Sequence, residues 1–97
     1  MNINYIQSCT EINLNNYQGT KILINFTATF SDSTYGSANI RTSILVNKND
    51  LSNRRFVLFS IDNKHGGGYI DIANNLFKIG AYNGTAKLDS VSILSIN

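Results

Sequence analysis

Residues 64–72, KHGGGYIDI, place the only histidine of the chain directly before three glycines. One large class of esterases uses such a run to direct backbone N–H groups at the oxyanion that forms during ester cleavage. That chemistry also requires a serine within a G-x-S-x-G turn and a histidine that acts as general base. The nearest approach to the serine turn, YGSA at residues 35–38, has one glycine, and His65 cannot fill both histidine roles. We therefore predict no esterase activity, and we expect the three glycines to mark a bend, a bulge or a close approach of two backbones.

The other residues that could do chemistry are dispersed along the chain. Cys9 is the only cysteine, so an internal disulfide and a cysteine-based metal site are both excluded. The aspartates do not have the spacing of a calcium-binding loop, and no pattern pairs two carboxylates for glycosidase chemistry. The sequence therefore predicts that the chain is not an enzyme, with no catalytic residue, no metal and no cofactor.

Groups suited to sugar recognition are plentiful near the expected turns. Aromatic rings pack against the apolar face of a pyranose, and short polar side chains bind its hydroxyl groups. Three segments carry both kinds of group, at residues 31–37, 62–69 and 82–85, and loops carry binding residues more often than strands do. The residues that we expect to bind a ligand are Tyr35, Tyr69, His65, Asp32, Asn63, Tyr82, Asn83 and Arg54.

Each candidate also has a purely structural interpretation. Tyr82 could pack one face against a strand, and His65 could simply be solvated. Arg54 and Arg55 could contact an anionic cell-wall polymer through charge-assisted hydrogen bonds, or they could begin a strand in solvent. The sequence alone leaves these alternatives open.

The elements that must position the loops are β-strands. Apolar and polar residues alternate along nearly the whole chain, and the helical period does not persist for more than a turn. Residues 21–30, KILINFTATF, give the clearest strand, with one apolar face made by Ile22, Ile24, Phe26, Ala28 and Phe30. Further strands are expected at residues 3–7, 10–14, 37–46, 56–61, 68–73, 76–82 and 88–96.

Asn74 and Asn75 predict a tight hairpin between two of these strands, because asparagine tolerates the left-handed backbone conformation. Its inward residues should be Ile70, Ile72, Phe77 and Ile79. Polar turn clusters recur between most of the expected strands, which is typical of sandwiches and barrels. The sequence thus predicts one domain, residues 1–97, with an all-β fold: an antiparallel, jelly-roll-like β-sandwich of about eight strands.

Residues 56–61, FVLFSI, are nearly continuous in apolar character. We expect this strand to be buried on both faces. A small sandwich has only one inner face per strand, so the other face would have to be covered by a neighbouring subunit.

Composition excludes several classes of protein. Hydrophobic residues make up 42% of the chain and charged residues only 14%, which predicts an ordered domain. The eight basic residues give a net charge of +2 and are scattered, so we expect no nucleic-acid partner. Neither a membrane-spanning apolar run nor the pattern of a signal peptide is present, so we expect no membrane insertion.

The order of these features resembles the C-terminal receptor-binding head domains of phage and prophage tail fibres and baseplate proteins. An opening turn at residues 12–17, INLNNY, leads into the alternating strand at 21–26, and a second long strand at 40–45, IRTSIL, runs into the loop at 47–53. The segments that resemble the closing strands of the family are GGYIDI at 67–72, FKIGAYNG at 77–84 and KLDSVSILSI at 87–96. Many such heads end in a Tyr-Gly-Ile type motif, whereas this chain ends in LSIN.

The resemblance implies a homotrimer at the virion tail tip, which contacts other tail proteins and attaches to a saccharide or protein on the bacterial surface. We therefore expect a non-enzymatic host-recognition domain that acts outside the host cell. One alternative is a structural assembly or decoration module of a phage particle. Another is a free carbohydrate-binding module, although such modules usually carry tryptophan and this chain has none.

Overall fold

The computed structural model describes residues 2–62 and 65–96, with side chains described from Cys9 onward. Apart from one short 3-10 turn, η1 (Leu14–Asn16), the described elements are strands. They are β1 (Asn2–Cys9), β2 (Glu11–Asn13), β3 (Lys21–Asp32), β4 (Gly36–Asn47), β5 (Arg54–Ile61), β6 (Gly66–Ala73), β7 (Leu76–Ala81) and β8 (Gly84–Ile96). The predicted all-β fold is confirmed.

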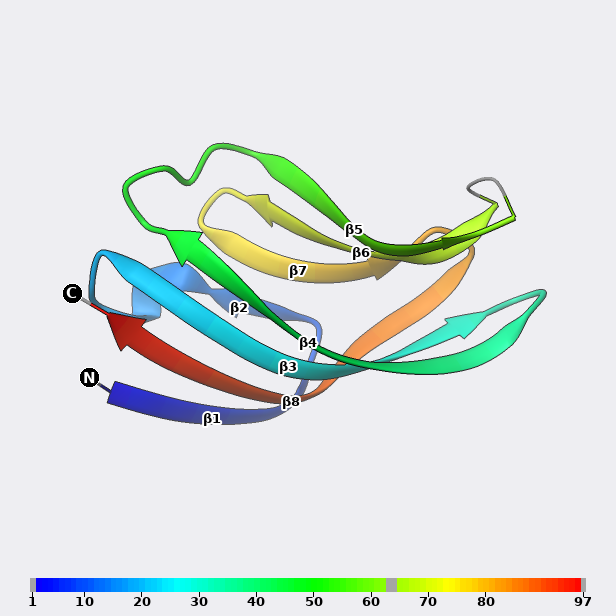
Figure 1. Ribbon diagram of the computed structural model, residues 1–97, viewed down its shortest axis with the longest axis horizontal. Coiled ribbons are helices and arrows are strands. Elements are labelled where there is room, and N and C mark those ends of the chain that lie inside the picture. Colours follow the sequence, from blue (N-terminus) through cyan, green and yellow to red (C-terminus); the bar gives the residue numbers. More distant parts are fainter. Residues whose placement is uncertain (1, 63–64, 97) are drawn as a thin grey trace.

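The strands form two antiparallel sheets that pack into a sandwich (Figure 1). One sheet has the strand order β1-β8-β3-β4, and the other has the order β2-β7-β6-β5. The connectivity resembles that of a jelly roll, because successive strands from the two ends of the chain pair in alternate sheets. β1 pairs with β8 in one sheet, and β2 pairs with β7 in the other. The middle of the chain is simpler, since β3 and β4 form a hairpin within one sheet and β5, β6 and β7 are consecutive neighbours in the other.

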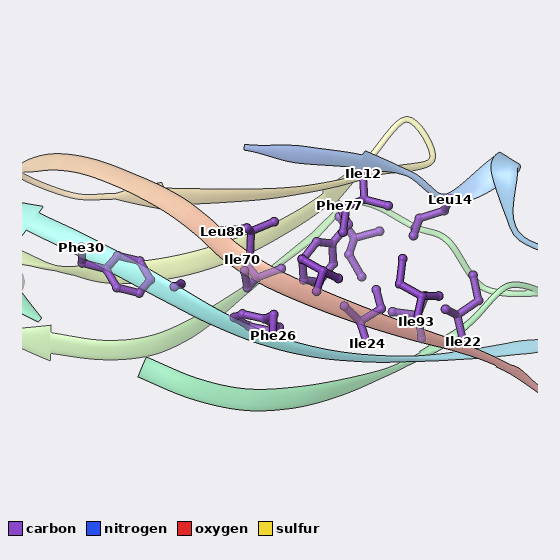
Figure 2. Close-up of a cluster of buried hydrophobic side chains, with 14 residues drawn as sticks. Ile12, Leu14, Ile22, Ile24, Phe26, Phe30, Ile70, Phe77, Leu88 and Ile93 are labelled. Carbon is purple, nitrogen blue, oxygen red and sulfur yellow. The ribbon is translucent and has the colours of Figure 1, made fainter. Parts of the chain in front are cut away.

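The core lies between the sheets and is centred on β3, which pairs with β8 on one side and β4 on the other. All five inward residues predicted for this strand are buried. Phe26 of β3 meets Phe77 of β7 edge to face, with 5.7 Å between the ring centroids. Figure 2 shows these rings among the other buried side chains, which come from β2, β3, β4, β6, β7, β8 and the η1 turn.

The predicted hairpin joins β6 to β7. Asn74 and Asn75 have φ angles of 53° and 63°, the left-handed conformation that a tight two-residue turn requires. Ile72 pairs with Phe77 and Ile70 with Ile79, so the predicted inward residues share one face. Three of them are buried and Ile79 is partly buried.

The three glycines are the first residues of β6, and they permit a close approach of backbones, one of the alternatives expected. A β-carbon on Gly68 would overlap the ring of Phe30, and one on Gly67 would overlap the carbonyl oxygen of Phe59. Gly67 also has a φ of 131°, which disfavours any other residue. Opposite them, the register of β5 shifts between Val57 and Phe59, as at a β-bulge.

The chain itself covers only one face of the strand at residues 56–61, so coverage of the other face by a neighbouring subunit stays a prediction. β5 is an edge strand that pairs only with β6, none of its residues is fully buried, and Val57 is 56% exposed. The predicted start of the last strand is wrong. β8 begins at Gly84 rather than Leu88, because residues 84–87 continue to pair with the end of β3, and Tyr82 lies in the turn before β8.

The edge-to-face pair of the core gives a test of the fold. We expect Phe77→Ala to lower the free energy of unfolding by about 3–5 kcal/mol, because it removes a fully buried ring and leaves a cavity. Val57→Ala, on the exposed edge strand, should change it by less than about 0.5 kcal/mol. Urea unfolding followed by circular dichroism measures both. Equal losses for the two variants would contradict the described core.

Candidate functional site

The three loops named as ligand-binding candidates meet at one end of the sandwich, on the right of Figure 1. Backbone hydrogen bonds tie two of the connections together, since Ser33 N–H donates to the carbonyl oxygen of Asn83 at 2.9 Å. Tyr82 N–H donates to the carbonyl of Gly67 at 3.0 Å, which ties the third segment to them. The antiparallel pairing thus brings together loops that are far apart in the sequence.

Asp32 holds these loops in place. Its Oδ1 atom accepts hydrogen bonds from the backbone N–H groups of Thr34 and Tyr35, at 2.7 and 2.9 Å, and lies 3.4 Å from the side-chain amide nitrogen of Asn83. Its Oδ2 atom is buried against Gly66 and has no hydrogen-bond partner among the described residues. The geometry therefore makes Asp32 an organiser of the loops, with no free oxygen presented to solvent.

Tyr35 links the first loop to the second. Its hydroxyl donates a 2.7 Å hydrogen bond to Oδ2 of Asp62, and its side chain is half exposed. Nδ1 of His65 lies 3.7 Å from the same carboxylate oxygen. The hydrogen bond to Asp62 raises the pKa of Tyr35, with smaller contributions from burial and from the charge of Asp32. We call Asp32, Tyr35, Asp62, His65 and Asn83 the loop-end cluster.

A narrow cavity lies beneath this cluster, between the two sheets. Its volume is about 20 Å³, room for little more than one water molecule. The lining is mostly apolar and comprises Phe30, Ser31, Asp32, Gly36, Ala38, Phe59, Ile61, Gly67 and Ala81. A sugar ring cannot enter so small a space, so a ligand at this end would lie on the surface.

A second group of side chains lies beside the cluster, on the outer face of β5, β6 and β7. Tyr69 points outward, as predicted, and its ring centroid is 4.8 Å from that of Tyr82. The guanidinium carbon of Arg55 lies 3.8 Å from the centroid of the Tyr69 ring. We call Arg55, Tyr69 and Tyr82 the tyrosine–arginine stack; the sequence neighbours Tyr82 and Asn83 join it to the loop-end cluster.

Asp71 fixes the arginine of this stack. Its carboxylate accepts hydrogen bonds from Nε and Nη2 of Arg55, at 2.7 and 2.9 Å, across the β5–β6 pair. The bonds from Arg55 hold the pKa of Asp71 below its ordinary value, and they raise the pKa of Arg55. Both groups therefore stay charged through the neutral range.

Two of the predicted residues do not belong to either group. Arg54 lies at the far end of β5, where its guanidinium contacts Asp50 at 2.9 Å and Ser52. Asn63 lies outside the described residues. The list of expected ligand-binding residues also lacks Asp62, which the structure brings to Tyr35, and Arg55, which lies beside the tyrosines while Arg54 does not.

A wider depression lies at the other sheet, beside the beginning of β8. It has a volume of about 390 Å³, within the range of small-ligand sites. Most of its lining residues carry a hydroxyl group beside apolar carbon atoms, and they comprise Thr10, Thr29, Ser31, Thr85, Ala86 and Lys87. It contains none of the predicted residues and no aromatic ring, so it offers hydrogen bonds but no stacking surface.

The described part of the chain contains neither a group of side chains that could bind a metal nor a membrane-spanning helix. No three His, Cys, Asp or Glu side chains within residues 2–62 and 65–96 are grouped so that they could hold a metal ion. In the same residues, no helix is long and apolar enough to cross a membrane.

Comparison with known proteins adds no relative. No family model, no curated protein and no solved structure matches this chain. The site is therefore interpreted from its own geometry.

The hydrogen bond between Tyr35 and Asp62 predicts a pH dependence. Because the pKa of Tyr35 is raised in the folded protein, this bond stabilises the fold below about pH 10, the value for an unperturbed tyrosine. Its contribution is lost as the pH rises through the pKa of folded Tyr35. Burial also raises the pKa of Tyr17, so we expect the tyrosinate absorbance of the folded protein to include a late-titrating component from both residues, which Tyr35→Phe reduces.

Asp62→Asn provides the control for this assignment. It removes the charged acceptor, so the pKa of Tyr35 should fall toward its ordinary value while the other tyrosines titrate as before. If Tyr35→Phe removed only a component that titrates near the ordinary tyrosine pKa, and Asp62→Asn left the curve unchanged, the Tyr35–Asp62 contact would be contradicted.

Proposed function

We propose that this chain is a non-enzymatic host-recognition domain of a phage or phage-like tail, which binds a glycan on the bacterial cell surface. The observation that carries the proposal is the convergence of the loop-end cluster and the tyrosine–arginine stack at one end of the sandwich. Hydroxyl, amide, carboxylate and imidazole groups there lie next to aromatic rings. A saccharide requires this combination, because it has many hydroxyl groups and one apolar ring face.

The groups of the loop-end cluster are held before a ligand arrives. Asp32 fixes the backbone of the first loop, and Tyr35 is held by Asp62 of the second. A ligand that binds preset groups loses less conformational entropy on the protein side. Asp32 and Asp62 are both occupied in holding loops, which supports recognition over acid–base catalysis.

We propose that the domain assembles as a homotrimer with other tail proteins at the virion tail tip. Since β8 faces β7 and β3 faces β6, the edge strands β4 and β5 lie on the same side of the sandwich. Leu45 of β4 is 58% exposed, and it continues a cross-strand row with Leu23 and Leu94. Contact with other subunits would remove this apolar surface from water.

The second candidate is a structural assembly module of a phage particle that binds no ligand. The exposed apolar side chains of β4 and β5 favour it, because subunit contacts alone would explain them. Binding to intact bacteria discriminates between the two functions, since only the recognition domain requires a surface glycan.

We expect the fluorescently labelled domain to bind cells of a susceptible bacterial strain in a panel, and to bind their purified surface glycan. Tyr35→Ala should weaken that binding about tenfold, because it removes an exposed ring and releases Asp62. Lys21→Ala, at the start of β3 and so at the opposite end of the sandwich, is the control and should bind as the wild type does. Lack of binding to every strain and glycan would count decisively for the assembly module.

Light scattering tests the assembly. We expect the wild-type domain to be a trimer at micromolar concentration and Leu45→Asp to be a monomer, because the substitution places a charge within the apolar row. Leu45 is exposed, so the variant should keep its circular dichroism spectrum. A wild-type monomer would contradict the proposed trimer.

A further inference from the structure

We infer that the tyrosine–arginine stack is a subsite for a single neutral hexopyranose ring, and that Gly80 is the residue that positions it. This inference rests on the proposed function and assigns the substrate class of one part of the surface. The stack leaves the ring of Tyr82 exposed, while the guanidinium of Arg55 lies over the ring of Tyr69 beside it. An aromatic face and hydrogen-bond donors thus lie together, as recognition of a pyranose ring requires.

The stack is preformed. Arg55 is fixed at one side by two hydrogen bonds to Asp71, and its guanidinium lies 3.8 Å from the ring centroid of Tyr69. The Tyr82 ring is tilted by 51° against the ring of Tyr69. Few rotatable bonds remain to be fixed when a ligand binds, so the entropy cost at this surface is small.

Gly80 allows the ring of Tyr69 to lie down on the sheet. The two residues are directly opposite in the β6–β7 pair, and a β-carbon on Gly80 would overlap the Cζ, Cε1 and hydroxyl atoms of Tyr69. With any larger residue at position 80 the ring would have to stand away from the sheet. The arginine would then lose the aromatic face on which it rests.

Part of the stack remains available to a ligand. Tyr82 is 39% exposed, and Val57, which pairs with Tyr69, is exposed on the same side. Arg55 uses Nε and Nη2 to bind Asp71, and the hydroxyl of Tyr82 also lies close enough to the guanidinium to raise the pKa of Arg55. The guanidinium and this hydroxyl together can offer hydrogen bonds to a hydroxyl or ring oxygen of a sugar that rests on Tyr82.

The charges on this face favour a neutral ring. Arg55 is paired with Asp71, and Lys78 of the next strand lies 3.8 Å from Glu11. Asp71 and Lys78 are also opposite one another in the β6–β7 register. The acidic group of a uronic acid or a phosphorylated sugar would have to displace Asp71 from Arg55 or lie next to the Asp71 carboxylate. In the second case the two negative charges would repel one another.

A purely structural role is the competing explanation, since the same contacts attach the edge strand β5 to β6. The two roles differ in what Gly80→Ala does. Tyr69 can turn toward solvent when its place on the sheet is lost, so the fold should persist while the platform is lost. A structural stack would give a change in stability and no change in ligand binding.

The test is ligand-observed saturation-transfer NMR with methyl glycosides of glucose, galactose, mannose and N-acetylglucosamine, and with glucuronate as the acidic comparison. We expect at least one neutral glycoside to bind more tightly than glucuronate, with transfer concentrated on the protons of one ring face. Gly80→Ala and Tyr82→Ala should each weaken that binding about three- to tenfold. Arg41→Ala, an exposed arginine on β4 in the other sheet, is the control and should bind as the wild type does.

Each outcome is decisive, and Tyr82→Ala remains informative if Gly80→Ala unfolds. Unchanged binding in both variants would overturn the subsite while the proposed function stands, provided that cells are still bound. The subsite alone would also be overturned if glucuronate bound more tightly than every neutral glycoside. The same holds if the domain bound cells but none of the glycosides. Failure to bind any glycoside, cell or purified glycan would overturn both.

Discussion

The surface at the loop end depends on how closely β6 approaches the end of β3. The ring of Phe30 lies against the backbone of Gly68, and the buried oxygen of Asp32 lies against Gly66. Protein interiors are packed too densely to absorb a side chain at either position without a shift of the strands. Because these glycines carry none, the turn that precedes β6 reaches Tyr35 and can hold it through Asp62. The glycines at residues 66–68 thereby determine where the loops meet.

Two kinds of order result from this arrangement. In the loop-end cluster, a carboxylate that is partly buried binds backbone N–H groups and holds polar side chains in place. On the neighbouring face, rings and a guanidinium support one another through stacking, and the charges are neutralised across adjacent strands. The first kind offers directional hydrogen bonds, and the second offers the exposed ring of Tyr82. Asn83 belongs to the first group and its neighbour Tyr82 to the second. A ligand that spans both would meet polar groups on one side and an aromatic face on the other.

Local patterns made most of the fold predictable. The alternation along β3 and the asparagine pair before β7 act through neighbouring residues, so their effects are visible in the sequence. Edge position is not a local property, so the apolar run of β5 did not reveal that this strand lies at the edge of its sheet. The same limit explains the choice of Arg54. Which of two adjacent arginines faces the tyrosines is decided by the register between β5 and β6, and a single-residue difference reverses the face.

The site was predictable only as a set of loops. Residues rich in aromatic and short polar side chains indicated the segments, but the partners of each side chain depend on contacts between segments. Asp62 lay within a named loop, and its role follows only once the hydroxyl of Tyr35 is brought to it. Asp32 was expected to face a ligand, yet the backbone N–H groups of its own turn already bind it.

The two edge strands on the open side of the sandwich differ in their capacity to recruit another chain by strand addition. The register of β5 is broken between Val57 and Phe59, and its first two residues are arginines, features that discourage a further strand from pairing there. β4 is a regular strand of 12 residues with a single charged side chain and no proline. The unpaired N–H and C=O groups along the outer edge of β4 can therefore pair with a strand of another molecule. A newly made single chain is most open to misassociation at this edge. Rapid coverage of β4 would protect the chain during its synthesis, before any ligand is met.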